Sequence, residues 1–174
     1  MPLTKPKNIN ASSITTGTLT NTNLPSGTLI NSHTVDARFS EVNVTSTSYV
    51  SIHSDLTFNY TPVLTSSKIY VVGEISISPH DNAGATAAGG SWAIFLNGTE
   101  QGKQTGAHEY YLGGSGWTNP DLYFGHTVKT AIFTNTNGNA LAIDIKGRKY
   151  TGNNIRFNQG AQWNSLVHVY EYKT

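Results

Sequence analysis

The sequence predicts an all-β protein, an antiparallel, jelly-roll-like β-sandwich of about eight strands. Three observations favour this fold. Short runs alternate between apolar and polar residues, as half-buried strands do. Glycine, proline and asparagine separate these runs at intervals typical of a sandwich. Charged residues make up only 12% of the chain, and Ser, Thr, Asn and Gly, which are poor helix formers, take their place.

The strands expected in the first half of the chain end at prolines. Residues 42–60 contain three short runs, and the last, 56–60, places Leu56, Phe58 and Tyr60 on one face before Pro62. Residues 69–78 begin with a run that is apolar on both faces, which predicts a central strand ending at Pro79. Proline donates no ladder hydrogen bond, so both prolines are expected to stop their strands.

Two Asn-Gly pairs predict hairpins in the second half, because both central positions of a type I′ turn need positive φ. Asn97-Gly98 follows an expected strand at 92–96. Asn137-Gly138 is the stronger signal, since it lies between the alternating runs 127–133 and 140–145. Each pair is therefore expected to join two neighbouring strands.

The remaining connections are inferred from glycine. Gly147 and Gly152 bracket an expected loop, and strands at 155–157 and 166–172 close the chain. Nine glycines lie between Asn82 and Thr118. This density predicts two long loops within 79–118, flanking the strand at 92–96, and long loops are often functional.

The first 30 residues differ from the rest, with no aromatic residue and two charges. We expect residues 1–30 to form an extended N-terminal stem and residues 31–174 to form the sandwich. The stem cannot bury enough apolar surface to fold alone, so it should lie against other subunits or a larger particle. Its anchoring residues would be Ile9, Ile14, Leu19, Leu24 and Leu29.

Charge and composition argue against several classes of partner. A net charge of +1 provides no field to hold nucleic acid, and the longest apolar runs are too short to insert in a membrane. The chain has no cysteine, which removes disulfides and thiolate metal sites. We therefore expect subunit association to supply the stability that a thin core lacks.

No metal or cofactor is expected from the histidines. The six of them, His33, His53, His80, His108, His126 and His168, show no metal-binding spacing. If an ion were bound on a symmetry axis by one histidine from each subunit, His168 would be the first choice. Its alternative position is the solvent face of the last strand.

The sequence also predicts no enzyme. Glycoside hydrolysis would need two carboxylates held close together in a cleft, and the acids near the long loops are few: Asp81, Glu100, Glu109 and Asp121. The run Gly113-Gly114-Ser115-Gly116-Trp117 matches no nucleotide-binding or nucleophile motif and is interpreted as a flexible loop.

One aromatic and polar group in the long loops is a candidate site for a host glycan or receptor. Exposed aromatic rings beside polar side chains suit sugars, because a pyranose has an apolar face and a rim of hydroxyls. A subunit interface or the core is the preferred alternative for the same residues. They are Tyr110, Tyr111, Trp117, Asp121 and Tyr123.

Several motifs resemble a recurrent domain of phage tail-fibre and virion structural proteins, common in marine and cyanobacterial phages. They are Leu-Pro-Ser-Gly at 24–27, Thr-Ser-Thr-Ser-Tyr-Val at 45–50, Thr-Pro followed by Ser-Ser-Lys-Ile within 61–69, and a last strand ending near Glu171. The likeness covers the stem and first half, the last strand loosely, and 79–125 not at all. It implies a homotrimeric, β-rich knob on a thin stem.

The expected function is therefore that of a non-enzymatic phage virion protein, made in the host cytoplasm and exposed on the virion surface. A trimeric head fibre, capsid decoration spike or small fibre tip fits the length, with residues 1–30 bound to other capsid or tail proteins. One alternative is a receptor-binding tail-fibre knob that recognises a host glycan through the loops at 79–125. Another is a small β-sandwich lectin unrelated to phage.

Overall fold

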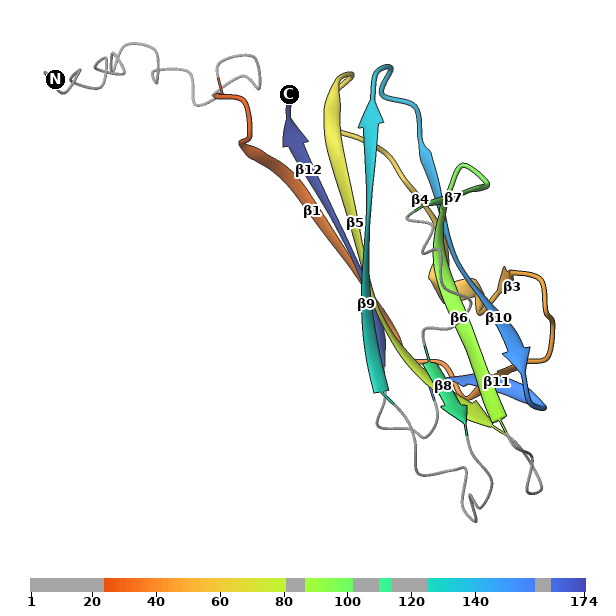
Figure 1. Ribbon diagram of the computed structural model, residues 1–174. Coiled ribbons are helices and arrows are strands. Elements are labelled where there is room, and N and C mark those ends of the chain that lie inside the picture. Colours follow the sequence, from red (N-terminus) through yellow and green to blue (C-terminus); the bar gives the residue numbers. More distant parts are fainter. Residues whose placement is uncertain (1–23, 81–86, 102–109, 114–124, 159–163) are drawn as a thin grey trace, which may run out of the picture.

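The computed structural model describes residues 24–80, 87–101, 110–113, 125–158 and 164–174. Within these ranges the chain forms twelve strands and one short 3-10 turn, arranged in two antiparallel sheets. Figure 1 shows the two sheets packed face to face. The predicted all-β antiparallel sandwich is confirmed. No helix in the described part of the chain has the length and hydropathy of a membrane span.

Sheet A is built around β5 (Ser67–His80), which pairs with β12 and then β11 along one side and with β9 along the other. The prediction of a central strand at this position is confirmed. β1 pairs with the outer side of β12, and β2 with the outer side of β11. These strands are β1 (Leu29–Ala37), β2 (Val42–Val44), β9 (Gly125–Asn135), β11 (Asn154–Phe157) and β12 (Ser165–Lys173).

Sheet B has β10 and β6 at its centre. β4 and β3 pair with the free side of β10, and β7 and β8 pair with the free side of β6. The 3-10 turn η3 (Ser54–Leu56) leads into β4. The strands are β3 (Val50–Ser51), β4 (Thr57–Tyr60), β6 (Ala87–Leu96), β7 (Thr99–Gln101), β8 (Tyr110–Gly113) and β10 (Leu141–Thr151).

The core lies between the sheets and follows the period-two pattern of the strands. At η3 and β4 the sequence correctly assigns Leu56, Phe58 and Tyr60 to one face, since Leu56 and Tyr60 are buried and Phe58 packs against the core. The largest fully buried hydrophobic side chains are Trp92, Phe157, Leu56, Ile69, Ile75, Ile77, Ile94, Leu141, Ile143, Ile145 and Ile155.

The second predicted hairpin is wrong. Gly138 has the positive φ expected of a turn, at +72°, but β9 pairs with β5 in sheet A while β10 lies in sheet B. Asn135 stabilises this crossover, because its Oδ1 accepts from the amides of Asn137 and Gly138 and its Nδ2 donates to the carbonyl of Leu64. The first hairpin is confirmed: Asn97 and Gly98 have φ of 49° and 76° between β6 and β7.

Gly147 does not bracket a loop but lies inside β10. A Cβ added there would stand 2.5 Å from Cζ of Phe157, so this glycine allows an aromatic ring to approach the strand closely. Gly152, with φ of +81°, does lie at the turn into β11. The sequence predicts both glycines as turn residues because composition cannot separate the two uses.

The strand end expected at Pro79 and the two long loops expected within 79–118 are also wrong in part. Pro79 does not stop β5, which continues to His80. The pairing of β5 with β9 reaches only as far as Ile77, and beyond it β11 is the described neighbour of β5. The missing amide hydrogen of Pro79 therefore breaks no hydrogen bond to β9. β6 begins at Ala87, and β7 and β8 lie within the expected loops. Much of this glycine-rich stretch is therefore sheet.

The sandwich has two distinct poles. At the first, which we call the N-terminal pole, the chain enters beside the end of β12: the amide of Gly27 donates to the carbonyl of Lys173 at 2.8 Å, and the amide of Lys173 donates to the carbonyl of Thr28 at 2.9 Å. At the second, the loop pole, β5 ends at His80 and β9 begins at Gly125 (Figure 1). The stem boundary expected at residue 30 falls inside β1, a strand that the sequence does not predict.

Candidate functional site

The aromatic group predicted as a glycan site is not brought together by the described structure. Tyr110 and Tyr111 lie on β8, where their backbones pair with Gly90 and Gly89 of β6. Trp117, Asp121 and Tyr123 lie outside the described residues. The prediction for this group therefore stays a prediction.

Of the predicted anchoring residues, Ile9, Ile14 and Leu19 also lie outside the described residues. Leu24 is half-buried at the N-terminal pole, and its carbonyl accepts a hydrogen bond of 2.5 Å from Nζ of Lys173. Leu29 begins β1 opposite Tyr172 and is exposed.

The candidate site is a groove on the outer face of sheet A, with a volume of about 740 Å³. It arises from strand alternation: within residues 67–74 of β5 and 165–172 of β12, odd-numbered residues face the core and even-numbered ones face outward. We call it the tyrosine groove. Its lining residues are Ser26, Gly27, Lys68, Tyr70, Val72, Tyr170, Tyr172, Lys173 and Thr174.

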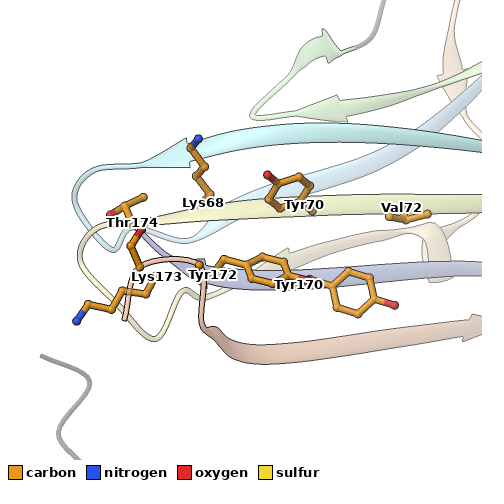
Figure 2. Close-up of a pocket in the computed structure, with 9 residues that line it drawn as sticks. Lys68, Tyr70, Val72, Tyr170, Tyr172, Lys173 and Thr174 are labelled. Atoms are coloured by element: carbon orange, nitrogen blue, oxygen red, sulfur yellow. The ribbon is translucent and has the colours of Figure 1, made fainter. Parts of the chain in front are cut away.

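Three half-buried tyrosines form the body of the tyrosine groove. Tyr70 and Tyr170 are direct register partners on β5 and β12, and Tyr70 meets Tyr172 edge to face, with ring centroids 5.3 Å apart at 81°. Figure 2 shows Tyr170 and Tyr172 following one another along β12, with Tyr70 beside them on β5. The edge-to-face contact favours a fixed orientation of both rings.

The charged side chains that line the tyrosine groove lie at one end and are positive. Lys68 and Lys173 flank this end (Figure 2). The lining residues include no aspartate or glutamate, because Glu171 points to the opposite face and is fully buried. Glu74 lies farther along β5, where Oε1 is 3.4 Å from Nδ1 of His126.

A short turn closes the same end of the tyrosine groove. Gly27 adopts φ of +83°, a conformation that strongly favours glycine, and Thr28 donates from its hydroxyl to the carbonyl of Pro25 at 2.7 Å. Two backbone hydrogen bonds also join residues 27 and 28 to Lys173. Together these contacts fix Ser26 and Gly27 as one wall of the groove. The wall is thus held by backbone geometry.

Beside the tyrosine groove, the edge strand β9 exposes two large apolar side chains. Val128 is 63% exposed and Ile132 is 55% exposed. Ile132 is the register partner of Tyr70, and Val128 pairs with Glu74, so both lie on the same outer face. In the described residues, β9 pairs with β5 alone, which leaves a long strand edge and its apolar side chains uncovered. We call this surface the β9 strip.

The inner face of β9 carries a lysine between the sheets. Lys129 donates from Nζ to the carbonyl of Trp92 and stands 5.0 Å from the centroid of the Trp92 ring. Burial lowers the pKa of Lys129 to about 8, with Glu100 opposing the shift and Arg148 adding to it. Nε1 of Trp92 donates to the hydroxyl of Thr127 at 2.5 Å, so the indole is fixed from both sides.

The small basic cluster on sheet B is occupied by aromatic contacts. Arg148 lies 4.5 Å from the ring centroid of Tyr49, and Lys146 lies 4.6 Å from that of Phe95. Arg148 also donates from Nε to the hydroxyl of Ser91 at 3.1 Å. These cations stabilise the packing of the strand surface.

The described histidines are not grouped with other side chains that ligate metals. Within the described ranges no group of three or more His, Cys, Asp or Glu side chains could hold an ion. His168 lies half-buried on the outer face of sheet A, where Nδ1 is 3.0 Å from the hydroxyl of Thr34 and the ring stacks on Tyr170.

Sequence reasoning missed the tyrosine groove, although it contained a signal. Residues 69–72 are apolar on both faces, which indicated a strand covered on both sides. The structure covers one side with sheet B and leaves Tyr70 and Val72 on an outer face that no described strand covers. In a sandwich of only two sheets, each strand has one face on the core and one outer face. A strand that is apolar on both faces therefore indicates apolar surface on the outside of the sandwich.

At the level of sequence, neither a protein-family model nor a curated protein matches the chain. Among solved structures, a match is found with the crystal structure of dimeric latent PorU from Porphyromonas gingivalis, at 10% sequence identity and a TM-score of 0.36. The match covers 86% of this chain but only 13% of that chain. A similarity at this level carries no inference about function.

Proposed function

We propose that this chain is a non-enzymatic structural protein of a phage virion. In this proposal it assembles as a homotrimer, its N-terminal residues attach it to other virion proteins, and its β-sandwich is displayed at the particle surface. The resemblance of its sequence motifs to virion fibre domains motivates this proposal. The separation of the two poles of the sandwich is the structural observation that supports it best.

A displayed spike needs its attachment and its free end on opposite sides of the molecule. The chain enters at the N-terminal pole, where residues 24–28 are bonded to Lys173. At the loop pole, β5 ends at His80 and β9 begins at Gly125. β5 runs between the poles with 14 residues, a length of about 45 Å at the usual rise of a strand.

The β9 strip supports the proposal of association between copies. Val128 and Ile132 are more than half exposed on a strand of 11 residues at the edge of sheet A. Long uncovered edges and contiguous apolar surface are features that soluble monomers usually avoid. A second copy of the chain would cover both features at once, and three copies around an axis would leave no β9 strip free.

The double substitution V128K/I132K tests this interface. We expect the full wild-type chain to sediment as a trimer and the variant as a monomer with unchanged far-UV circular dichroism. V50K is the matched control, because Val50 is 40% exposed on β3 of sheet B and its change should leave the mass unchanged. An unchanged trimer in V128K/I132K would remove the β9 strip from the interface.

Particle attachment is tested separately. Antibody raised against the purified protein should label intact phage particles in immunogold electron microscopy. A chain lacking residues 1–23 keeps the described bonds at the N-terminal pole and should remain a trimer but fail to bind particles. Particles that are not labelled, or that take up the shortened chain as well as the full one, would contradict the proposal.

A further inference from the structure

We infer that a second copy of this chain docks on the tyrosine groove, and that the β9 strip of one copy lies in the tyrosine groove of the next. The inference rests on the proposed association and adds to it the surface that covers the β9 strip. In this arrangement Ile132 of one copy packs against Tyr70 and Tyr170 of another.

The β9 strip and the tyrosine groove are neighbours on the outer face of sheet A. Ile132 is the register partner of Tyr70, and Tyr70 is the register partner of Tyr170. These side chains therefore form one row across β9, β5 and β12, with about 4.8 Å between neighbouring strands. A helix, or a sheet of two strands, is about 10 Å wide, so a partner that covers Ile132 also reaches the tyrosine groove.

The β9 strip is too small to hold two copies together by itself. β9 has 11 residues, so the strip is about 37 Å long and about 5 Å wide, roughly 180 Å² in projection. Even twice this area is well below the roughly 800 Å² that each partner buries in a stable interface. Over residues 67–74 of β5, the four strands β9, β5, β12 and β1 together present about 500 Å² in projection. Association through the β9 strip thus requires the strands that carry the tyrosine groove.

The two surfaces match in polarity. The outward side chains of β9 from Val128 to Thr134 alternate between aliphatic residues and threonine, and all of them are exposed and uncharged. Aliphatic side chains can pack on tyrosine rings while threonine hydroxyls meet phenol hydroxyls, and tyrosine is enriched at protein interfaces for this combination. The side chains that form the body of the groove are also uncharged: Tyr70, Val72, Tyr170 and Tyr172.

The lysines at the end of the groove do not oppose this docking. Nζ of Lys173 donates to the carbonyl of Leu24. Figure 2 shows the side chains of Lys68 and Lys173 extending away from the tyrosine rings. A second copy can therefore cover the rings without burying an unpaired ammonium group, which would be costly.

A contact between one strip and one groove explains how the assembly ends. Each copy carries one β9 strip and one tyrosine groove, so a single contact of this kind leaves one of each uncovered. Contacts of this head-to-tail type continue until a ring closes. A ring of three copies covers all three strips and all three grooves, which is the trimer of the proposed function.

Engineered disulfides test the contact in the full chain, which has no cysteine of its own. In I132C/Y170C the two thiols of one copy lie two strands apart, with about 9.6 Å between the strands, which is too far for a disulfide within one chain. Oxidation should therefore link neighbouring copies. We expect a covalent trimer in denaturing electrophoresis without reductant and a single chain after reduction.

A second pair keeps all three tyrosines and both exposed apolar residues of the β9 strip. V72C/T134C places one thiol in the groove and one on the strip, four residues out of register and thus about 13 Å apart along the strands of one copy. At least one of the two pairs should give the covalent trimer. V50C/I132C is the matched control, because Val50 lies on β3 of sheet B, and it should stay a single chain.

Mixing two variants tests the same contact without cysteine. Y170K places a charge in the groove but keeps the strip, whereas V128K/I132K keeps the groove. Each variant alone should dissociate at concentrations at least tenfold higher than the wild type does. An equimolar mixture should form a complex of two chains, because the strip of Y170K can still enter the groove of V128K/I132K.

Light scattering of the wild type separates failure of the inference from failure of the proposed association. A wild-type trimer for which neither groove pair cross-links and the mixed variants stay monomeric would overturn the inference alone, and the β9 strip would then be covered by another surface. Cross-linking of V50C/I132C as complete as that of the groove pairs, or a covalent product that ends at two chains, would also overturn it. A monomeric wild type would overturn both.

Discussion

The phenol of Tyr60 donates a hydrogen bond of 2.9 Å to a carboxylate oxygen of Glu171, and both residues are buried. This bond joins β4 of sheet B to β12 of sheet A across the core. The same carboxylate accepts from the amides of Val63 and Leu64, at 2.8 and 3.0 Å. Glu171 thus closes the N-terminal pole from inside, while its neighbour Tyr172 lines the tyrosine groove outside.

Replacing Glu171 by glutamine should destabilise the protein strongly. The side chain keeps its size, but its NH₂ group would face at least one of the donors that now point at a carboxylate oxygen. A buried donor left without an acceptor costs about 1–3 kcal/mol, and more beside a charged group, so we expect E171Q to lose about 3 kcal/mol in urea denaturation. Y60F removes one donor alone and should lose less. Equal stability of E171Q and the wild type would refute this role.

The phenol of Tyr60 should lose its proton only at strongly alkaline pH. Burial, the hydrogen bond to Glu171 and its charge raise the pKa of Tyr60 to about 12, with Asn31 opposing the shift. Because the folded-state pKa exceeds the unfolded value of roughly 10, the associated stability is complete below pH 10 and is lost as pH rises toward 12. Ultraviolet absorbance titration should show a late phenolate signal that is missing in Y60F. Identical titration curves would contradict the assignment.

Lys129 should make stability rise with pH. Its folded-state pKa of about 8 lies below the ordinary value of 10.5, so between these values the unfolded chain holds a proton that the folded chain has lost. Stability therefore increases from about pH 8 toward 10.5. In K129M this increase should be absent. Urea midpoints at pH 7.5, 8.5 and 9.5 measure it, and parallel curves for the two proteins would contradict the burial of the amine.

Gly147 should not tolerate a side chain. In G147A the new Cβ would meet the ring of Phe157 at 2.5 Å, and that ring is fully buried, so we expect a loss of about 2–3 kcal/mol from overpacking. G98A is the control: nothing lies within 4 Å of its new Cβ, and only the strain of a φ of +76° remains, which costs about 1 kcal/mol. Equal losses in the two variants, measured by thermal unfolding, would show that Phe157 moves aside.

The sequence predicts strands well where burial alternates locally. β4 and β12 match the expected runs because each has one face on the core, and the Asn97-Gly98 turn is recognised because its two residues alone determine it. The Asn137-Gly138 turn is not a hairpin, since the choice between sheets depends on Asn135 and its contacts with Leu64, far away in the chain. Local chemistry determines a turn but not the sheet that follows it.

The tyrosine groove could not be predicted because its parts are distant in sequence. Tyr70 and Tyr170 become neighbours only through the register of β5 with β12, which pairs Val71 with Val169 on the core side. A shift of one residue in this register would point the tyrosines into the core. Without the pairing, an alternating Tyr-x-Tyr run is equally consistent with a buried strand and with an exposed one.

Association is the central claim, and the mass of the full-length wild-type chain in solution tests it most directly. Size-exclusion chromatography with multi-angle light scattering at micromolar concentration should give three times the mass of one chain. A mass equal to one chain, with the β9 strip open to water, would contradict the account.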